Sequence, residues 1–283
     1  MSLIDRVLSC ANYNAEDYHP LLVDGHKVGQ VSARVAGELA DFGTIFDFIN
    51  MEFHLSQDIK GFKERSTIMS EVARNLFDRG LIAGWREELY PVAPKFGVPA
   101  LFNIERAAVP FFGIRGYGVH INGWLGSGNE PQMWIGRRSR SKPTGAGQLD
   151  QVVAGGLPLG IGLMENVIKE CQEEASIGAL LARQAIPVGT VSYITKREEG
   201  LRHDVLFNYD LRLPENFTPI NGDGEVDEFM LWPISKVVHE VGREGVFKFN
   251  SALVVIDYLV RHGFISPESP GYTEIVSGLH REI

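Results

Sequence analysis

The chain has 283 residues, of which 44% are hydrophobic and 22% are charged. This supplies enough apolar material for one large or two modest globular domains. The formal net charge of −9 argues against nucleic acid as a bulk partner, because polyanion-binding surfaces are basic. It leaves room for a local basic pocket that binds a small phosphorylated ligand.

Cysteine usage and apolar runs indicate the compartment. Only two cysteines occur, Cys10 and Cys171, too few for a disulfide framework, so both are predicted to be reduced thiols in or near the core. Asp5 and Arg6 interrupt the first apolar patch, which argues against a secretory signal. The longest apolar run, residues 252–260, is far too short to span a bilayer. We therefore expect a cytoplasmic protein with no membrane partner.

The first part of the chain predicts strands and helices but no cluster of potential ligands. Helices are predicted at residues 2–10 and 66–79, strands at 21–31 and 45–55, and an extended segment at 85–91. We expect this part to pack against the rest of the protein or to position a substrate.

Proline and glycine residues punctuate the chain between residues 94 and 116, where we place a domain boundary. We divide the chain into an N-terminal α+β domain, residues 1–110, and a C-terminal domain, residues 111–283. In the second domain, strands are predicted at 117–121, 133–136, 186–194, 204–213 and 222–231, and closing helices at 251–262 and 271–281.

A basic, hydroxyl-rich stretch at residues 137–142 directly precedes a glycine-rich stretch in a protein that is otherwise acidic. Basic stretches are commonly mere solvated surface, but this position favours contact with a phosphate. Two further polar side chains lie on the polar face of the strand at 117–121. The candidate phosphate- or substrate-binding side chains are Arg137, Arg138, Arg140, Lys142, His120 and Asn122.

The most informative segment runs from Gly155 to Ile177. Gly155 and Gly156 open a stretch with four glycines, which predicts a loop that turns tightly and approaches a ligand closely. Residues 163–175 then predict an amphipathic helix with Cys171 on its apolar face.

This predicted helix carries Glu170, Glu173 and Glu174 at positions i, i+3 and i+4, so their carboxylates are expected to project as a cluster. A solvated acidic face would explain a lone group of this kind. Like charges at that spacing repel, but Mg²⁺ or Mn²⁺ would make them favourable, because hard cations prefer carboxylate oxygens.

The glycines, the apolar helical face and the three glutamates together resemble the Nudix box, whose pattern reads G-x5-E-x7-R-E-U-x-E-E-x-G-U with U bulky and apolar. Three positions depart, as Ile161, Lys169 and Ser176 replace the first glutamate, the arginine and the late glycine. The glutamate and the arginine are both replaced, so neither charge is left without its partner. We expect Lys169 to pair with Glu165, and Gly178 to act as a shifted helix cap.

Longer phrases, among them WREELYP, FFGIRGYGVHINGW and VIDYLVRHGFI, resemble the Nudix subfamily that is fused to thiamine pyrophosphokinase in fungi. In plastids and bacteria its members stand alone, and they carry an extra N-terminal domain. The resemblance implies an α/β (α+β) Nudix fold, a mixed sheet sandwiched between helices, preceded by a small α+β domain. It also implies metal-dependent hydrolysis of a diphosphate, with thiamine diphosphate or its oxidised, damaged forms as substrate, releasing the monophosphate and phosphate.

The resemblance places Mg²⁺ or Mn²⁺ on Glu170, Glu173 and Glu174, with Gly155 and Gly156 beside the phosphates. The general base is Glu173 or the downstream Glu225, and the sequence does not decide between them. The alternatives are hydrolysis of an 8-oxo-nucleoside diphosphate, CoA or ADP-ribose, or a non-catalytic Nudix module that senses a ligand. The sequence leaves a homodimer open.

Overall fold

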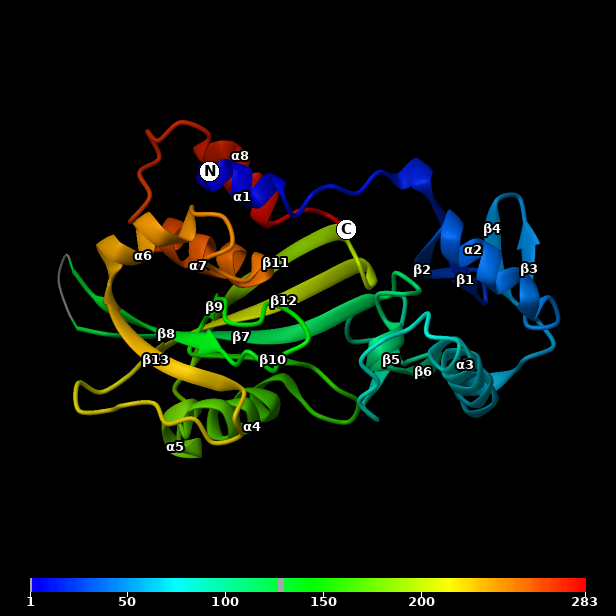
Figure 1. Ribbon diagram of the computed structural model, residues 1–283, viewed down its shortest axis with the longest axis horizontal. Helices are drawn as coiled ribbons and strands as arrows, with labels where there is room; N and C mark the ends of the chain where they lie inside the picture. Colours follow the sequence, from blue (N-terminus) through cyan, green and yellow to red (C-terminus); the bar gives the residue numbers. More distant parts are fainter. Residues whose placement is uncertain (1, 127–129) are drawn as a thin grey trace.

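The computed structural model describes residues 2–126 and 130–283. Figure 1 shows two lobes, an N-terminal unit in blue and cyan and a larger C-terminal unit in green to red. The N-terminal unit has one hydrophobic core. The C-terminal unit has two, one on each face of its main sheet.

The N-terminal unit contains a four-stranded sheet in the order β2-β1-β4-β3. The strands predicted at 21–31 and 45–55 are two hairpins instead. Asp24 and Gly25, with φ of 50° and 75°, form the two-residue turn of the first hairpin, which needs positive φ at both positions. The strands are β1 (Tyr18–Val23), β2 (His26–Ser32), β3 (Phe46–Ile49) and β4 (Glu52–Leu55).

Two helices, three short 3₁₀ turns and a strand pair complete the described part of this unit. The helix α2 (Ala33–Leu39) was not predicted, and α3 (Gly61–Asp78) begins earlier than the predicted start at residue 66. The strands β5 (Leu89–Val92) and β6 (Phe102–Glu105) pair antiparallel, and β6 packs against α3. Short 3₁₀ turns are η1 (Ala15–Asp17), η2 (Ala40–Phe42) and η3 (Arg106–Ala108).

The main sheet of the C-terminal unit has the strand order β11-β12-β7-β8-β13, with β10 paired to β7 and β9 paired to β8. The β7–β12 pair is parallel and the others are antiparallel, so the sheet is mixed. Its strands are β7 (Arg115–Leu125), β8 (Gln132–Arg138), β9 (Leu149–Asp150), β10 (Val153–Gly156), β11 (Ile186–Arg197), β12 (Gly200–Arg212) and β13 (Val226–Pro233).

Helices cover both faces of this sheet (Figure 1), which confirms the predicted sandwich. On one face, Val119 and Ile121 of β7 share a core with Val167 and Cys171 of α4. On the other face the core is formed mainly by α6 and α7. The helices are α4 (Leu163–Ala175), α5 (Ala179–Ala182), α6 (Ile234–Val241) and α7 (Phe249–Arg261).

The first helix of the chain packs on the C-terminal unit. Val7 of α1 (Leu3–Leu8) lies against Gly278 of α8 (Tyr272–Leu279), and Arg6 donates a hydrogen bond to the Phe247 carbonyl at 3.1 Å. Figure 1 shows the chain then running from α1 across to the N-terminal unit. The domain division at residue 110 therefore stays a prediction, and α1 packs on the C-terminal unit although it lies before that boundary in the sequence.

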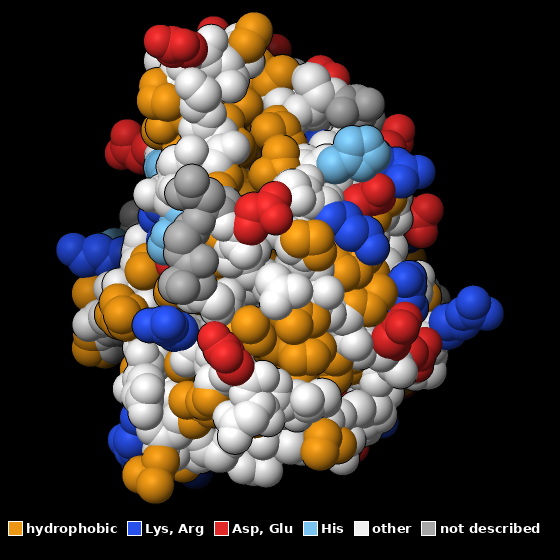
Figure 2. Space-filling model, turned by 90° about the vertical axis from the view of Figure 1, so that its left-hand side faces the viewer, with side chains coloured by type: hydrophobic (Ala, Val, Ile, Leu, Met, Phe, Trp, Pro, Cys, Tyr) orange, Lys and Arg blue, Asp and Glu red, His pale blue; other side chains and the backbone are white. Residues whose placement is uncertain are grey.

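The charged and apolar side chains on the surface indicate what kind of partner each face suits. Figure 2 shows the end of the C-terminal unit remote from the N-terminal unit, where basic, acidic and apolar side chains are interspersed. Within the part of the chain that the structure describes, none of the helices combines the length and apolarity needed to cross a bilayer.

Candidate active site

The helix α4 docks closely on the short strand β10. Glu174 accepts a hydrogen bond from the Ala154 amide at 2.8 Å, and Asn166 donates one to the Gly156 carbonyl at 2.8 Å. A Cβ atom on Gly155 would lie only 2.2 Å from the carboxyl carbon of Glu170. The glycines therefore allow the helix to approach the strand.

This packing corrects the predicted loop. Gly155 and Gly156 belong to β10 and pair with Val119 and Gly118 of β7. These two positions are glycine because Glu170 and Tyr90 fill the places where side chains would lie, and not because the chain turns there. The turn follows later, where Gly160 has a φ of 85°.

The helix α4 has the bounds predicted for it, but its end is formed differently. Ser176 itself adopts the left-handed conformation, with a φ of 54°, and its hydroxyl donates to the Ile220 carbonyl at 2.9 Å. Gly178 is therefore not the shifted cap. Lys169 does not pair with Glu165 either, since its Nζ lies 3.1 Å from Glu170 and 2.9 Å from Glu173.

The three glutamates differ in environment, which corrects the prediction of one projecting cluster. Glu174 is buried, the side chain of Glu170 is 13% exposed, and that of Glu173 is 48% exposed. The first two are one turn apart and face β10, whereas Glu173 faces solvent. Among the described residues, no three Asp, Glu, His or Cys side chains lie close enough together to hold a metal ion.

Burial raises the pKa of Glu174 well above its ordinary value. The Ala154 amide acts against this shift, while the charges of Glu170, Asp150 and Glu225 add to it. Burial also raises the pKa of Glu170, which Lys169 partly offsets. These carboxylates therefore favour a bound proton or a bound cation, and their oxygens are the donors that Mg²⁺ and Mn²⁺ prefer. The carboxylate oxygens of Glu170 and Glu174 are therefore the kind of donor atom that fits a divalent metal.

This shift predicts a pH effect on stability. The pKa of Glu174 in the folded protein lies above its ordinary value of 4.5, so its contribution to stability is present below pH 4.5 and is lost as pH rises through the raised pKa. We expect the metal-free wild type to lose stability relative to Glu174→Gln as pH rises. Chemical denaturation in chelator across this range measures the difference, and a difference independent of pH would contradict the expectation.

The basic stretch is largely engaged in ion pairs. Arg138 pairs with Asp150 at 2.8 Å, Arg137 with Glu228 at 3.3 Å, and Lys142 with Glu225. Burial acts to raise the pKa of Glu225, but the hydrogen bond and charge of Lys142, together with the charges of Arg138 and Arg86, outweigh it and lower that pKa. Arg140 is exposed to solvent.

A narrow cleft brings several predicted site residues together between β8, β9, α4 and the start of β13. Its lining combines the carboxylates of Glu174 and Glu225 with the guanidinium of Arg138. The full lining is Gly136, Arg138, Asp150, Gln151, Glu174, Glu225 and Val226.

His120 and Asn122 lie inside the core between the sheet and α7. His120 Nδ1 donates to Gln151 Oε1 at 2.7 Å, and burial lowers the pKa of this imidazole to about 4. Asn122 donates to Asp210 at 3.1 Å and is fully buried. The structure does not bring these two side chains to Glu170 or Glu173, and their contact with a substrate stays a prediction.

Sequence reasoning missed residues that the N-terminal unit brings to β10. A Cβ atom on Gly156 would lie 1.8 Å from the Tyr90 hydroxyl and 3.3 Å from Arg106 Nη2. Leu159 donates a backbone hydrogen bond to Leu89 at 3.0 Å. The phrase WREELYP that carries Tyr90 was noticed, but only packing between the units shows where it lies.

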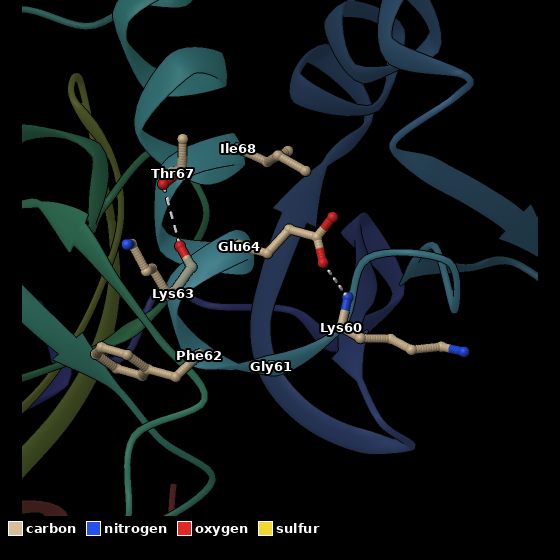
Figure 3. Close-up of a pocket in the computed structure, with 7 residues that line it drawn as sticks. All are labelled: Lys60, Gly61, Phe62, Lys63, Glu64, Thr67 and Ile68. Carbon is tan, nitrogen blue, oxygen red and sulfur yellow. Dashed lines mark hydrogen bonds between the residues drawn. The ribbon is translucent and has the colours of Figure 1, made fainter.

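A broad hollow at the start of α3 lies apart from these groups. Figure 3 shows its side chains spread along the first helical turns, with Glu64 accepting from the Lys60 amide at 2.9 Å and Thr67 donating to the Lys63 carbonyl at 3.1 Å. These are local contacts of a helix start, so the hollow is not a candidate active site. It is lined by Lys60, Gly61, Phe62, Lys63, Glu64, Thr67 and Ile68.

Comparisons with known proteins place the chain among relatives. A family model described as a domain of unknown function (DUF4743) matches residues 2–116. Nudix hydrolase 24, chloroplastic, of Arabidopsis thaliana is 45% identical over 261 residues, which cover 92% of this chain and 72% of that protein. Nudix hydrolase 20, chloroplastic, of the same plant is 43% identical over 272 residues, covering 93% and 73%.

Among solved structures, DR0079 from Deinococcus radiodurans is 20% identical, with a TM-score of 0.41 over 50% of this chain and 82% of that one. The word chloroplastic describes the two plant proteins, and a cytoplasmic location for this chain stays a prediction. Because the plant relatives are so similar along most of their length, the chain belongs to the Nudix hydrolase family and is a hydrolase that acts on diphosphates.

Proposed function

We propose that this Nudix hydrolase is a metal-dependent pyrophosphohydrolase that cleaves thiamine diphosphate, or its oxidised and damaged forms, to the monophosphate and phosphate. The docking of α4 on β10 carries the proposal. It sets the carboxylates of Glu170 and Glu174 side by side against β10, where their oxygens can hold a divalent cation that binds the diphosphate. The phrases shared with the thiamine pyrophosphokinase-related subfamily support the choice of substrate.

The proposed metal ligands are Glu170, Glu173 and Glu174. Nudix hydrolases generally need a divalent metal, and carboxylate oxygens suit Mg²⁺ or Mn²⁺. When bound, the cation neutralises charge on the diphosphate and lowers the pKa of a coordinated water. Lys169 Nζ lies between two of these carboxylates, 3.1 Å from Glu170 and 2.9 Å from Glu173.

Two carboxylates compete for the role of general base. Glu173 is our choice, because it is half exposed at the solvent side of the site, where it can take a proton from the attacking water and later release it to solvent. Glu225 lies in the same cleft as Glu174, and Lys142 keeps its pKa low. A low pKa makes Glu225 a weaker base at neutral pH.

The basic stretch would favour the damaged substrate through charge. Intact thiamine diphosphate carries a positive thiazolium ring, whereas oxidation to the oxo form makes the ring neutral and leaves the diphosphate unchanged. Cations of Arg137, Arg138, Arg140 and Lys142 would attract both diphosphates but repel only the intact ring, and Arg140 would act most directly because the other three pair with carboxylates. At an effective dielectric near 20, one such repulsion is on the order of 1–3 kcal/mol, or roughly ten- to a hundredfold in kcat/KM.

A substrate panel tests the proposal. We expect Mg²⁺-dependent release of phosphate, with kcat/KM for the oxidised form roughly ten- to a hundredfold above that for intact thiamine diphosphate. The panel also contains an 8-oxo-nucleoside diphosphate, ADP-ribose and CoA, each with Mg²⁺ or with chelator. A clear preference for one of these three contradicts the proposed substrate. Binding without hydrolysis across the whole panel contradicts the proposed catalysis and favours a sensing module.

A further inference from the structure

The N-terminal unit packs directly beside β10. Its strand β5 approaches the turn between β10 and α4, where Leu159 N donates to Leu89 O at 3.0 Å. The Tyr90 hydroxyl occupies the place that a side chain at position 156 would need. The two units therefore meet directly beside the glutamates of α4.

A buried carboxylate fixes the backbone of the N-terminal unit that faces β10. Glu105 is 2% exposed and accepts hydrogen bonds from the backbone amides of Arg86, Glu88 and Ala107, at 3.0, 3.2 and 3.2 Å. The Arg106 amide in turn donates to the Glu88 carbonyl at 2.8 Å. The segment before β5 and the turn after β6 are thereby held together as one rigid support.

This support presents the guanidinium of Arg106. Its Nη1 donates to Glu88 Oε2 at 2.7 Å, and its central carbon lies 5.6 Å from the centre of the Tyr90 ring. Its other terminal nitrogen, Nη2, lies on the side of Gly156, and the side chain remains 34% exposed. A guanidinium that is held by a carboxylate and an aromatic ring is pre-organised to bind an anion.

The opposite side of the Gly155–Gly156 backbone carries negative charge. Glu170 lies against Gly155. Burial raises the pKa of its carboxyl, Lys169 lowers it and Glu173 raises it, and Arg106 is near enough to add a smaller lowering effect. A cation and a group of carboxylates thus lie on the two sides of β10, close enough for their charges to act on each other. A metal-bound diphosphate has the matching charges, since its metal faces carboxylates and its phosphate oxygens face a guanidinium.

We propose that the N-terminal unit supplies a phosphate-binding wall of the active site, in which Arg106 binds an oxygen of the diphosphate beside Gly156. This inference rests on the proposed diphosphate hydrolysis. It assigns to the segment of unknown function at residues 2–116 a role in holding the substrate. Arg106 positions the substrate, and the carboxylates of α4 serve the reaction.

The test compares Arg106→Gln and Arg106→Lys with the wild type in the full chain. We expect Arg106→Gln to raise KM for the best diphosphate by about ten- to a hundredfold with kcat within about threefold, because it removes one charge-assisted contact. Arg106→Lys keeps the charge and should recover part of the loss. Arg79→Gln is the matched control, since Arg79 pairs with Glu38 and Asp41 away from β10 and should leave KM unchanged.

Calorimetric binding of inorganic pyrophosphate separates this inference from the proposed function. Weaker binding by Arg106→Gln than by wild type supports the wall, even if wild type hydrolyses nothing in the panel. Hydrolysis with KM and pyrophosphate affinity both unchanged in Arg106→Gln overturns the wall and leaves the function standing. If Arg106→Gln does not fold, Arg106→Lys decides in the same way, because unchanged KM and affinity in that variant also overturn it. Wild type that neither hydrolyses a diphosphate nor binds pyrophosphate overturns both.

Discussion

Replacement of Glu174 by glutamine is expected to lower kcat by at least about two orders of magnitude, the scale of a lost catalytic group. The fold should remain intact, because the glutamine carbonyl can still accept from the Ala154 amide. The substitution also removes a buried charge that lies near Glu170, Asp150 and Glu225. Thermal stability of the metal-free variant should therefore equal or exceed that of wild type. Steady-state kinetics at saturating Mg²⁺ and thermal unfolding in chelator measure the two effects.

The same loss of kcat is expected for Glu173→Gln, although Glu173 is half exposed and makes no contact with β10 that needs replacing. Glu71→Gln on the exposed face of α3 is the matched control and should leave kcat unchanged. Near-normal turnover in both α4 variants would show that these glutamates do not form the active site.

Replacement of Gly155 by alanine is expected to lower kcat by about ten- to a hundredfold, because a new methyl group displaces a carboxylate. The Cβ atom would lie 2.2 Å from Glu170 Cδ and 2.5 Å from its Cγ, so the side chain must swing away. A misplacement of about 1 Å near the reacting groups can cost on the order of 100-fold in rate. Stability should fall by only about 1–3 kcal/mol, since the end of a glutamate side chain can move.

Gly178→Ala provides the control for this substitution. A Cβ atom at Gly178 would meet nothing within 4 Å, and the residue is exposed, so neither kcat nor stability should change. A Gly155→Ala enzyme with wild-type kcat would mean that the position of Glu170 against β10 does not matter for turnover.

The helix α4 was predictable because its apolar positions repeat with helical spacing over thirteen residues. The long strands of the main sheet were likewise visible as alternating or apolar runs. The β10 strand was not, because glycines indicate a loop unless the neighbouring helix is known. Here the glycines are explained by Glu170 and Tyr90, which are distant in sequence from each other.

The different burial of the three glutamates likewise depends on tertiary contacts. Helical spacing shows that Glu170 and Glu174 share a face. The hydrogen bond that Glu174 accepts from the Ala154 amide, however, depends on where β10 lies. Arg106 carries no local signal, since its place beside Gly156 results from packing between the two units. The basic stretch was visible, but not that Asp150 and Glu225 bind two of its members.

The packing of α1 on α8 has a consequence for synthesis on the ribosome. Residues 3–8 leave the ribosome well before their partner at residues 272–279, which is made only after almost all of the intervening chain. The apolar side of α1 thus stays uncovered while the N-terminal unit and the main sheet are synthesised, and exposed apolar surface of this kind attracts chaperones and other nascent chains. The core around Val7 and Leu279 is completed only once residues 272–279 have emerged, by a contact of very long sequence separation, which makes its closure a slow step of folding.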